Sequence, residues 1–80
     1  MSIDVLLFAS YADSAGAPCV RVELPAEPTV ADLVSALRRH PGLGHLPNRP
    51  LVAVNHRYAR PEVVLASGDE VALIPPVAGG

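Results

Sequence analysis

The alternation of hydrophobic and polar positions predicts two strands in the first third of the chain. Residues 3–10 (IDVLLFAS) are almost wholly apolar, which is typical of a central strand. Residues 19–24 (CVRVEL) have every second residue apolar from Val20 to Leu24, so we expect a half-buried strand. Small residues, Gly and Pro interrupt the pattern at 11–18, and we predict that the two strands form a hairpin.

Residues 29–40 (TVADLVSALRRH) carry the one strong helix signal. Thr29 can cap the first turn, and Asp32 three residues later completes a capping box. Cationic residues fall in the last turn, where they suit the helix dipole, and Pro41 with Gly42 ends the helix. The buried stripe at helical spacing is predicted to be Val30, Leu33, Val34 and Leu37.

The second half of the chain is predicted to hold a loop and three further strands. We expect the loop at 41–50 with a short turn at 43–46, a strand at 51–55, a short edge strand at 57–65 broken by Pro61, a turn at 67–69 and a last strand at 70–75. The element order places one main helix over one face of a mixed sheet, an α+β arrangement. This is the β-grasp, or ubiquitin-like, fold. We predict a β-grasp domain over 1–75 and a flexible C-terminal Gly-Gly tail over 76–80.

One helix leaves the second face of the sheet without a cover. If Val5 and Leu7 point to the helix, Leu6 and Phe8 point away, and Ile74 does so on the last strand. Scattered surface apolar residues are normal, but a contiguous patch more often marks a protein interface. Because the first and last strands of this topology are adjacent, we favour an interface. The predicted patch consists of Leu6, Phe8 and Ile74, and Tyr58 of the short strand can join it.

The last residues, LIPPVAGG, predict an extended thread that leaves the sheet. Pro75 and Pro76 lack an N–H and have restricted φ angles, so they end the ladder and extend the chain. The predicted tail-insertion residues are Pro75, Pro76, Val77, Ala78 and Gly79. Two glycines without side chains can enter a narrow channel, and the carboxylate of Gly80 is ionised at neutral pH. Held in a partner's site, this weak nucleophile can attack an activated phosphate and form an acyl-adenylate.

Composition excludes several classes of function. A net charge of −2 and three aromatic residues without Trp argue against nucleic-acid binding. The single cysteine, Cys19, allows no internal disulfide and fits a reducing compartment. We expect a packing or surface role for it rather than sulfur relay. No signal peptide is indicated, and no stretch approaches the roughly 20 apolar residues of a membrane span, so we expect no membrane association and a cytoplasmic protein.

The histidines and arginines give weaker signals. His40, His45 and His56 lack the spacing and the additional ligands of a metal site, and we predict that no metal is bound. Five arginines could form a basic edge against an acidic partner, although a solvated face is the simpler interpretation. These are Arg38, Arg39, Arg49, Arg57 and Arg60.

The segments VLLFAS (5–10), TVADLVSAL (29–37), LVAVN (51–55) and GDEVALIPPVAGG (68–80) together resemble the MoaD-type sulfur carriers of the MoaD/ThiS family, the small subunits of molybdopterin synthase. The resemblance implies that an E1-like adenylyltransferase uses ATP to adenylate Gly80. A sulfur donor, such as a cysteine desulfurase or a rhodanese, then converts Gly80 to a thiocarboxylate.

The resemblance also implies that the family's apolar docking patch falls on Phe8, Tyr58 and Ile74, and that the tail inserts into the large subunit of molybdopterin synthase, in a heterotetramer. There it donates sulfur to cyclic pyranopterin monophosphate. This chain would be the non-catalytic subunit and would bind no cofactor, with the catalytic side chains on the large subunit. Three alternatives remain open: a carrier for thiamine or cysteine synthesis, a ubiquitin-like protein modifier, and a binding module whose tail does no chemistry.

Overall fold

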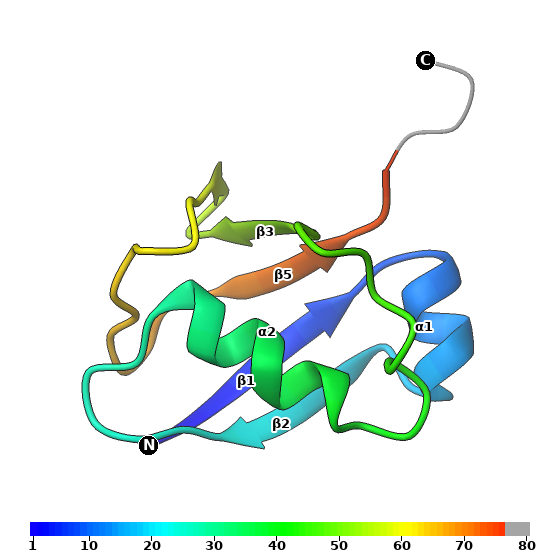
Figure 1. Cartoon of the computed structure of the whole chain (residues 1–80), viewed down its shortest axis with the longest axis horizontal. Helices are drawn as coiled ribbons and strands as arrows, with labels where there is room; N and C mark the ends of the chain where they lie inside the picture. The colour runs from blue at the N-terminus through cyan, green and yellow to red at the C-terminus, as the bar shows by residue number, and fades with distance from the viewer. Residues whose placement is uncertain (77–80) are drawn as a thin grey trace.

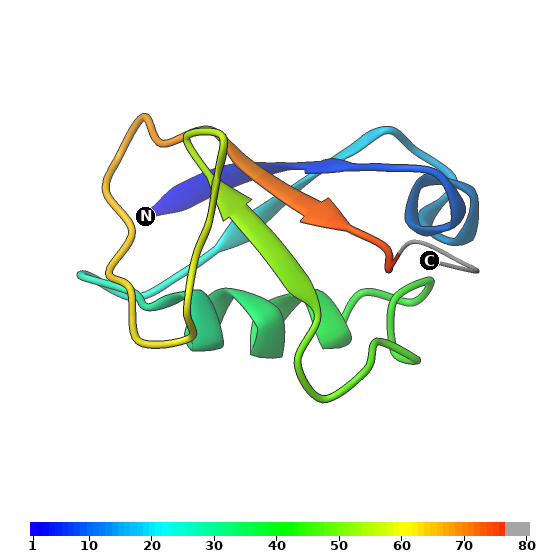
Figure 2. The same ribbon diagram turned by 90° about the horizontal axis from the view of Figure 1, so that it is seen from above.

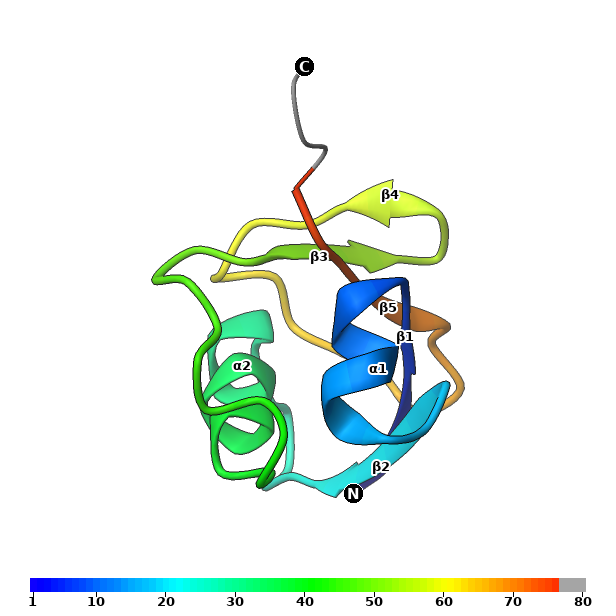
Figure 3. The same cartoon turned by 90° about the vertical axis from the view of Figure 1, so that its right-hand side faces the viewer.

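The computed structural model describes residues 1–76. Within this range the strands form one five-stranded sheet in the order β2-β1-β5-β3-β4, with β1 and β5 parallel and the other neighbours antiparallel. The strands are β1 (Ser2–Leu7), β2 (Cys19–Glu23), β3 (Leu51–Val54), β4 (Arg57–Tyr58) and β5 (Val71–Ile74). The helices are α1 (Ser10–Ala15) and α2 (Val30–Arg38), and both lie on the same side of the sheet (Figures 1 and 3).

The alternation seen in the sequence decides which face of each strand is buried. Along β1 the buried residues are Ile3, Val5 and Leu7, and their neighbours are exposed. The predicted hairpin of β1 with β2 and the adjacency of β1 and β5 are both confirmed. The core lies between this face and the helices, and Figure 2 shows α2 on one side of the strands. Strand β1 ends at Leu7, earlier than the predicted residue 10, and β5 spans 71–74.

Helix α2 begins where its local hydrogen bonds predict. The Thr29 hydroxyl accepts from the Asp32 amide at 3.2 Å, and the Asp32 carboxylate accepts from the Thr29 amide at 2.9 Å. Such a cap contributes about 1 kcal/mol. The helix ends at Arg38 rather than at residue 40, and Val34 is only partly buried while Ala36 is buried.

The segment at 11–18 was predicted as a connection, and this prediction is wrong because α1 occupies Ser10–Ala15. Six residues are too few to show a helical period. Tyr11, only 5% exposed, anchors this turn in the core. Gly16 ends the helix in the left-handed region at φ 74°, which glycine adopts without steric cost.

The predicted edge strand at 57–65 is also wrong over most of its length. Only Arg57–Tyr58 pair with β3, and the chain then crosses to the start of α2. There the carbonyl oxygens of Pro61 and Val63 accept from Ala31 and Val30, both at 2.9 Å. The loop 41–50 contains the predicted turn and buries Leu43 and Leu46 in the core.

Candidate functional site

The face of the sheet opposite the helices carries a row of residues in register across the strands. On this face Leu6 lies between Cys19 of β2 and Ala72 of β5. Ala72 pairs with Ala53 of β3, and Ala53 pairs with Tyr58 of β4. Because the two alanines are small, the middle of the row is lower than its flanks at Leu6 and Tyr58.

This low centre forms a shallow hollow of about 510 Å³, which we call the outer hollow. Phe8 and Tyr58 are 49% and 70% exposed, large values for aromatic residues. The predicted docking residues Phe8, Tyr58 and Ile74 therefore come together, although their role in docking stays a prediction. The hollow is lined by Leu6, Phe8, Ala53, His56, Tyr58, Glu70, Ala72 and Ile74.

His56 and Glu70 give the outer hollow a polar border. Their side chains approach to 2.8 Å, Nε2 to Oε2, an ion pair when the histidine is protonated. Asn55 and His56 form the β3–β4 turn with φ of 52° and 69°, the left-handed values of a tight hairpin. The Asn55 amide donates to the Glu70 carbonyl at 2.7 Å and joins this turn to β5. An apolar centre with a polar rim is the composition of many protein interfaces.

His56 and Glu70 are not among the residues that the sequence predicts for this surface, and His56 was weighed only as a metal ligand. The usable signal was the Asn-His pair between two strand segments, which favours a hairpin turn and therefore places His56 beside Tyr58. The partner residue Glu70 comes from a distant segment, and only the sheet pairing brings it to the turn.

The tail leaves the sheet beside the outer hollow. Ile74 lines the hollow, pairs with Leu51 and is the last residue of β5. Pro75 and Pro76 follow outside the ladder, as predicted, because they offer no N–H for strand pairing. The predicted tail residues Val77, Ala78, Gly79 and Gly80 lie outside the described residues.

The part of the chain that the structure describes offers few other candidate functional groups. No three His, Cys, Asp or Glu residues of this part group as metal ligands do. Cys19 is exposed at the end of the cross-strand row. Of the five arginines considered for a basic edge, Arg38, Arg49 and Arg60 line a second groove, whereas Arg39 and Arg57 do not. Neither helix within residues 1–76 has the length and apolar character to cross a membrane.

This sheet order, with α2 packed across one face, is the β-grasp, and the chain is thus a ubiquitin-like protein. The sequence model of the ThiS family matches residues 5–80. The chain therefore belongs to the ThiS family, and the resemblance to the MoaD/ThiS group is confirmed.

The similar proteins include both a sulfur carrier subunit and a protein called a modifier. The human protein called molybdopterin synthase sulfur carrier subunit is 35% identical, over 98% of this chain and 93% of its own length. Small archaeal modifier protein 1 of Haloferax volcanii is 40% identical, over 92% of this chain and 95% of its own. The crystal structure of SAMP1 from Haloferax volcanii superposes with a TM-score of 0.83 at 38% identity, covering 100% of both chains.

Proposed function

We propose that this protein is the sulfur carrier subunit of a molybdopterin synthase, with the sulfur held as a thiocarboxylate on Gly80. The observation that carries the proposal is the family match over residues 5–80, which includes the Pro-Pro-Val-Ala-Gly-Gly ending. The likeness to the human sulfur carrier subunit over 98% of this chain supports the same conclusion.

The outer hollow and the tail have separate roles in this function. A partner docks on the exposed apolar side chains of the hollow, where burial of apolar surface supplies the binding energy. Because Ile74 lines the hollow and Pro75 follows it, a docked partner is adjacent to the start of the tail. Pro75 and Pro76 favour an extended chain, and Ala78, Gly79 and Gly80 are small enough for a narrow channel.

Two partners use the same face at different times. An E1-like adenylyltransferase binds ATP, and the Gly80 carboxylate attacks the α-phosphorus to form an acyl-adenylate with release of pyrophosphate. Sulfur from the persulfide of a cysteine desulfurase or a rhodanese then attacks the acyl carbon, and AMP leaves. Reduction of the resulting acyl disulfide by a thiol releases the thiocarboxylate.

The second partner is the large subunit of the synthase, in a heterotetramer. Its active site receives the tail, and the thiocarboxylate sulfur passes to cyclic pyranopterin monophosphate. This chain holds no cofactor of its own, and the catalytic side chains belong to the large subunit. The reactions take place in the cytoplasm, where the exposed thiol of Cys19 stays reduced.

Intact-mass measurement tests the sulfur step. The full chain is incubated with an E1-like adenylyltransferase, ATP and a persulfide donor. We expect a mass increase equal to the difference between sulfur and oxygen, and no increase when ATP is omitted or when Gly79 and Gly80 are deleted. An unchanged mass under conditions that load a known carrier would contradict the proposal. Transfer to the pterin, followed with the large subunit present, separates this pathway from thiamine or cysteine synthesis.

A second candidate function is protein modification, favoured by the 40% identity with small archaeal modifier protein 1. In that case the adenylated Gly80 is transferred to lysine amines of other proteins. This chain contains no lysine, so it cannot form lysine-linked chains of itself. Mass spectrometry of tagged protein recovered from cells distinguishes the two: Gly80 isopeptides on lysines indicate a modifier, and a thiocarboxylate without isopeptides indicates a carrier.

A further inference from the structure

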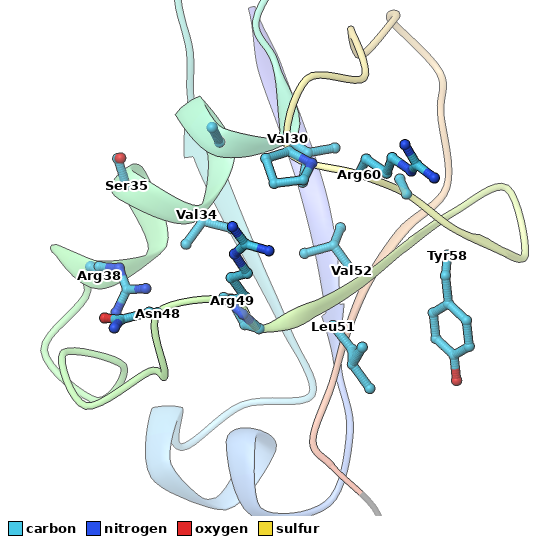
Figure 4. A pocket seen from close by; sticks show the side chains of 14 residues that line it. Val30, Val34, Ser35, Arg38, Asn48, Arg49, Leu51, Val52, Tyr58 and Arg60 are labelled. Carbon is cyan, nitrogen blue, oxygen red and sulfur yellow. The ribbon is translucent and has the colours of Figure 1, made fainter.

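A second groove, of about 380 Å³, lies between α2 and β3, and we call it the α2–β3 groove. Figure 4 shows Val34 of α2 on one side and Val52 of β3 on the other. Pro50, Ala59 and Pro61 add further apolar surface to its lining. A concave surface with an apolar floor is the common form of a binding site.

The walls of the α2–β3 groove are fastened by hydrogen bonds. The loop after β4 is tied to the first turn of α2 through the carbonyl oxygens of Pro61 and Val63. The guanidinium of Arg38 donates to the carbonyl oxygen of Leu46 at 2.5 Å and also to that of Pro47, which holds the loop before β3. These hydrogen bonds fix the position of both loops relative to α2.

The rim of the α2–β3 groove is positively charged. Arg38, Arg49 and Arg60 line it from three different segments, and no carboxylate is among its lining residues. Within residues 1–76 the ion pairs are Arg21 with Asp4 and His56 with Glu70, so Arg49 and Arg60 are not neutralised. A local excess of three positive charges stands out in a chain of net charge −2.

The groove and the outer hollow share one lining residue. Tyr58 lines both surfaces, from the edge strand β4. At the far end of β3, Leu51 lines the groove and pairs with Ile74 of the hollow. The two surfaces therefore meet at the edge of the sheet formed by β3 and β4.

We propose that the α2–β3 groove binds a short acidic segment of a partner protein. A large apolar side chain of the segment fills the space between Val34 and Val52, and flanking carboxylates pair with Arg49 and Arg60. Guanidinium groups bind carboxylates in paired hydrogen bonds, and complementary charge directs the partner to this edge. A small inorganic anion would meet the cations but leave the apolar floor in water, so a peptide fits the surface better.

NMR titration of the full ¹⁵N-labelled chain tests the site. The probe is an acetylated peptide of sequence Asp-Leu-Glu-Leu-Asp. We expect amide shifts at residues 30–38, at Arg49, Leu51 and Val52, and at Ala59 and Arg60. These shifts should weaken when salt rises from about 0.05 M to about 0.5 M. Absence of shifts, or shifts confined to the outer hollow, would overturn the assignment. Equal binding of Asp-Ser-Glu-Ser-Asp or of inorganic phosphate would also overturn it, because each would indicate a simple anion site.

Charge-reversal variants locate the contact. We expect Arg49→Glu and Arg60→Glu to weaken binding of the acidic peptide roughly three- to tenfold each, because both side chains are exposed at the rim. Arg39→Glu is the matched control, with the same charge change on an exposed residue outside the groove, and should leave binding nearly unchanged. If Arg39→Glu weakens binding as much, net charge rather than the groove attracts the peptide. The assay needs no sulfur chemistry, so its result is independent of the proposed function.

Discussion

Tyr58 of β4 pairs with Ala53 of β3 and lines both the outer hollow and the α2–β3 groove. Phe8 lines only the outer hollow. We therefore expect Tyr58→Ala to weaken binding of both the E1-like adenylyltransferase, which is the activating enzyme, and the acidic peptide. The loss for the enzyme should be roughly tenfold, because exposed aromatic residues at interfaces are frequent hot spots. Phe8→Ala should weaken only the enzyme. Calorimetric titration of each ligand checks this, and a Tyr58→Ala chain that binds both normally would contradict it.

Gly42 is held against α1 by backbone contact. A Cβ at this position would lie 2.0 Å from the carbonyl oxygen of Ser14, so the loop or the helix must move. We expect Gly42→Ala to cost about 1–3 kcal/mol of unfolding free energy. Gly44→Ala is the control because its Cβ meets only the Arg38 carbonyl oxygen at 3.7 Å, an ordinary contact. Chemical denaturation of both variants measures the difference, and equal stability would show that the close approach is unimportant.

The stability contributed by the turn before β5 depends on pH through the carboxylate of Asp69. Its carboxylate accepts from the Ala66 amide at 2.8 Å and from the Asn55 side chain at 3.0 Å, and these bonds lower the pKa of Asp69 below its ordinary 3.8. The lowered pKa means that this stabilisation is present above pH 3.8 and is lost as pH falls through the folded-state pKa.

We expect Asp69→Asn to lower the melting temperature at pH 7 by only a few degrees, because solvent screens this carboxylate. The difference should be smaller near pH 2–3, because the stabilisation by the Asp69 carboxylate is lost as pH falls. Glu62→Gln, at an exposed loop position, is the control. Thermal melts across this pH range provide the measurement, and a constant difference between wild type and Asp69→Asn would exclude the titration of Asp69 as its cause.

The terminal carboxylate is predicted to be the reactive group, which makes the chemistry sensitive to one added residue. We expect an alanine placed after Gly80 to abolish thiocarboxylate formation, because the family's chemistry is proposed to occur on the carboxylate of Gly80 itself. The melting temperature should not change, since Pro75 and Pro76 already lie outside the sheet. Mass spectrometry and a thermal melt on the same sample separate the two effects. Sulfur loading of the extended chain would place the reactive group elsewhere.

Cys19 offers a chemical probe of the outer face. It pairs with Leu6 and is exposed, so a bulky maleimide on its thiol reaches over the end of the cross-strand row. We expect the labelled protein to bind the activating enzyme more weakly, whereas Cys19→Ser should bind and carry sulfur normally. Loss of sulfur transfer in Cys19→Ser would instead support a relay role for the thiol.

Features that depend on residues close together in the chain can be predicted from the sequence. The Thr29–Asp32 capping box closes within three residues, so its pattern predicts the start of α2 without reference to the rest of the chain. Alternation likewise assigns Val5 and Leu7 to the core and Leu6 to the outer face, because successive strand residues point in opposite directions. These local signals predict the order of the elements, whereas the gathering of Phe8, Tyr58 and Ile74 on one face also requires the pairing of β1, β5, β3 and β4.

Features that depend on contacts between distant segments could not be predicted in this way. Helix α1 is too short for a recognisable period, and burial of Tyr11 in a core built by other elements holds it. Strand β4 is short because the next segment bonds instead to the start of α2. The meeting of Arg38, Arg49 and Arg60 around one groove depends on the packing of α2 against β3, which no spacing along the chain encodes.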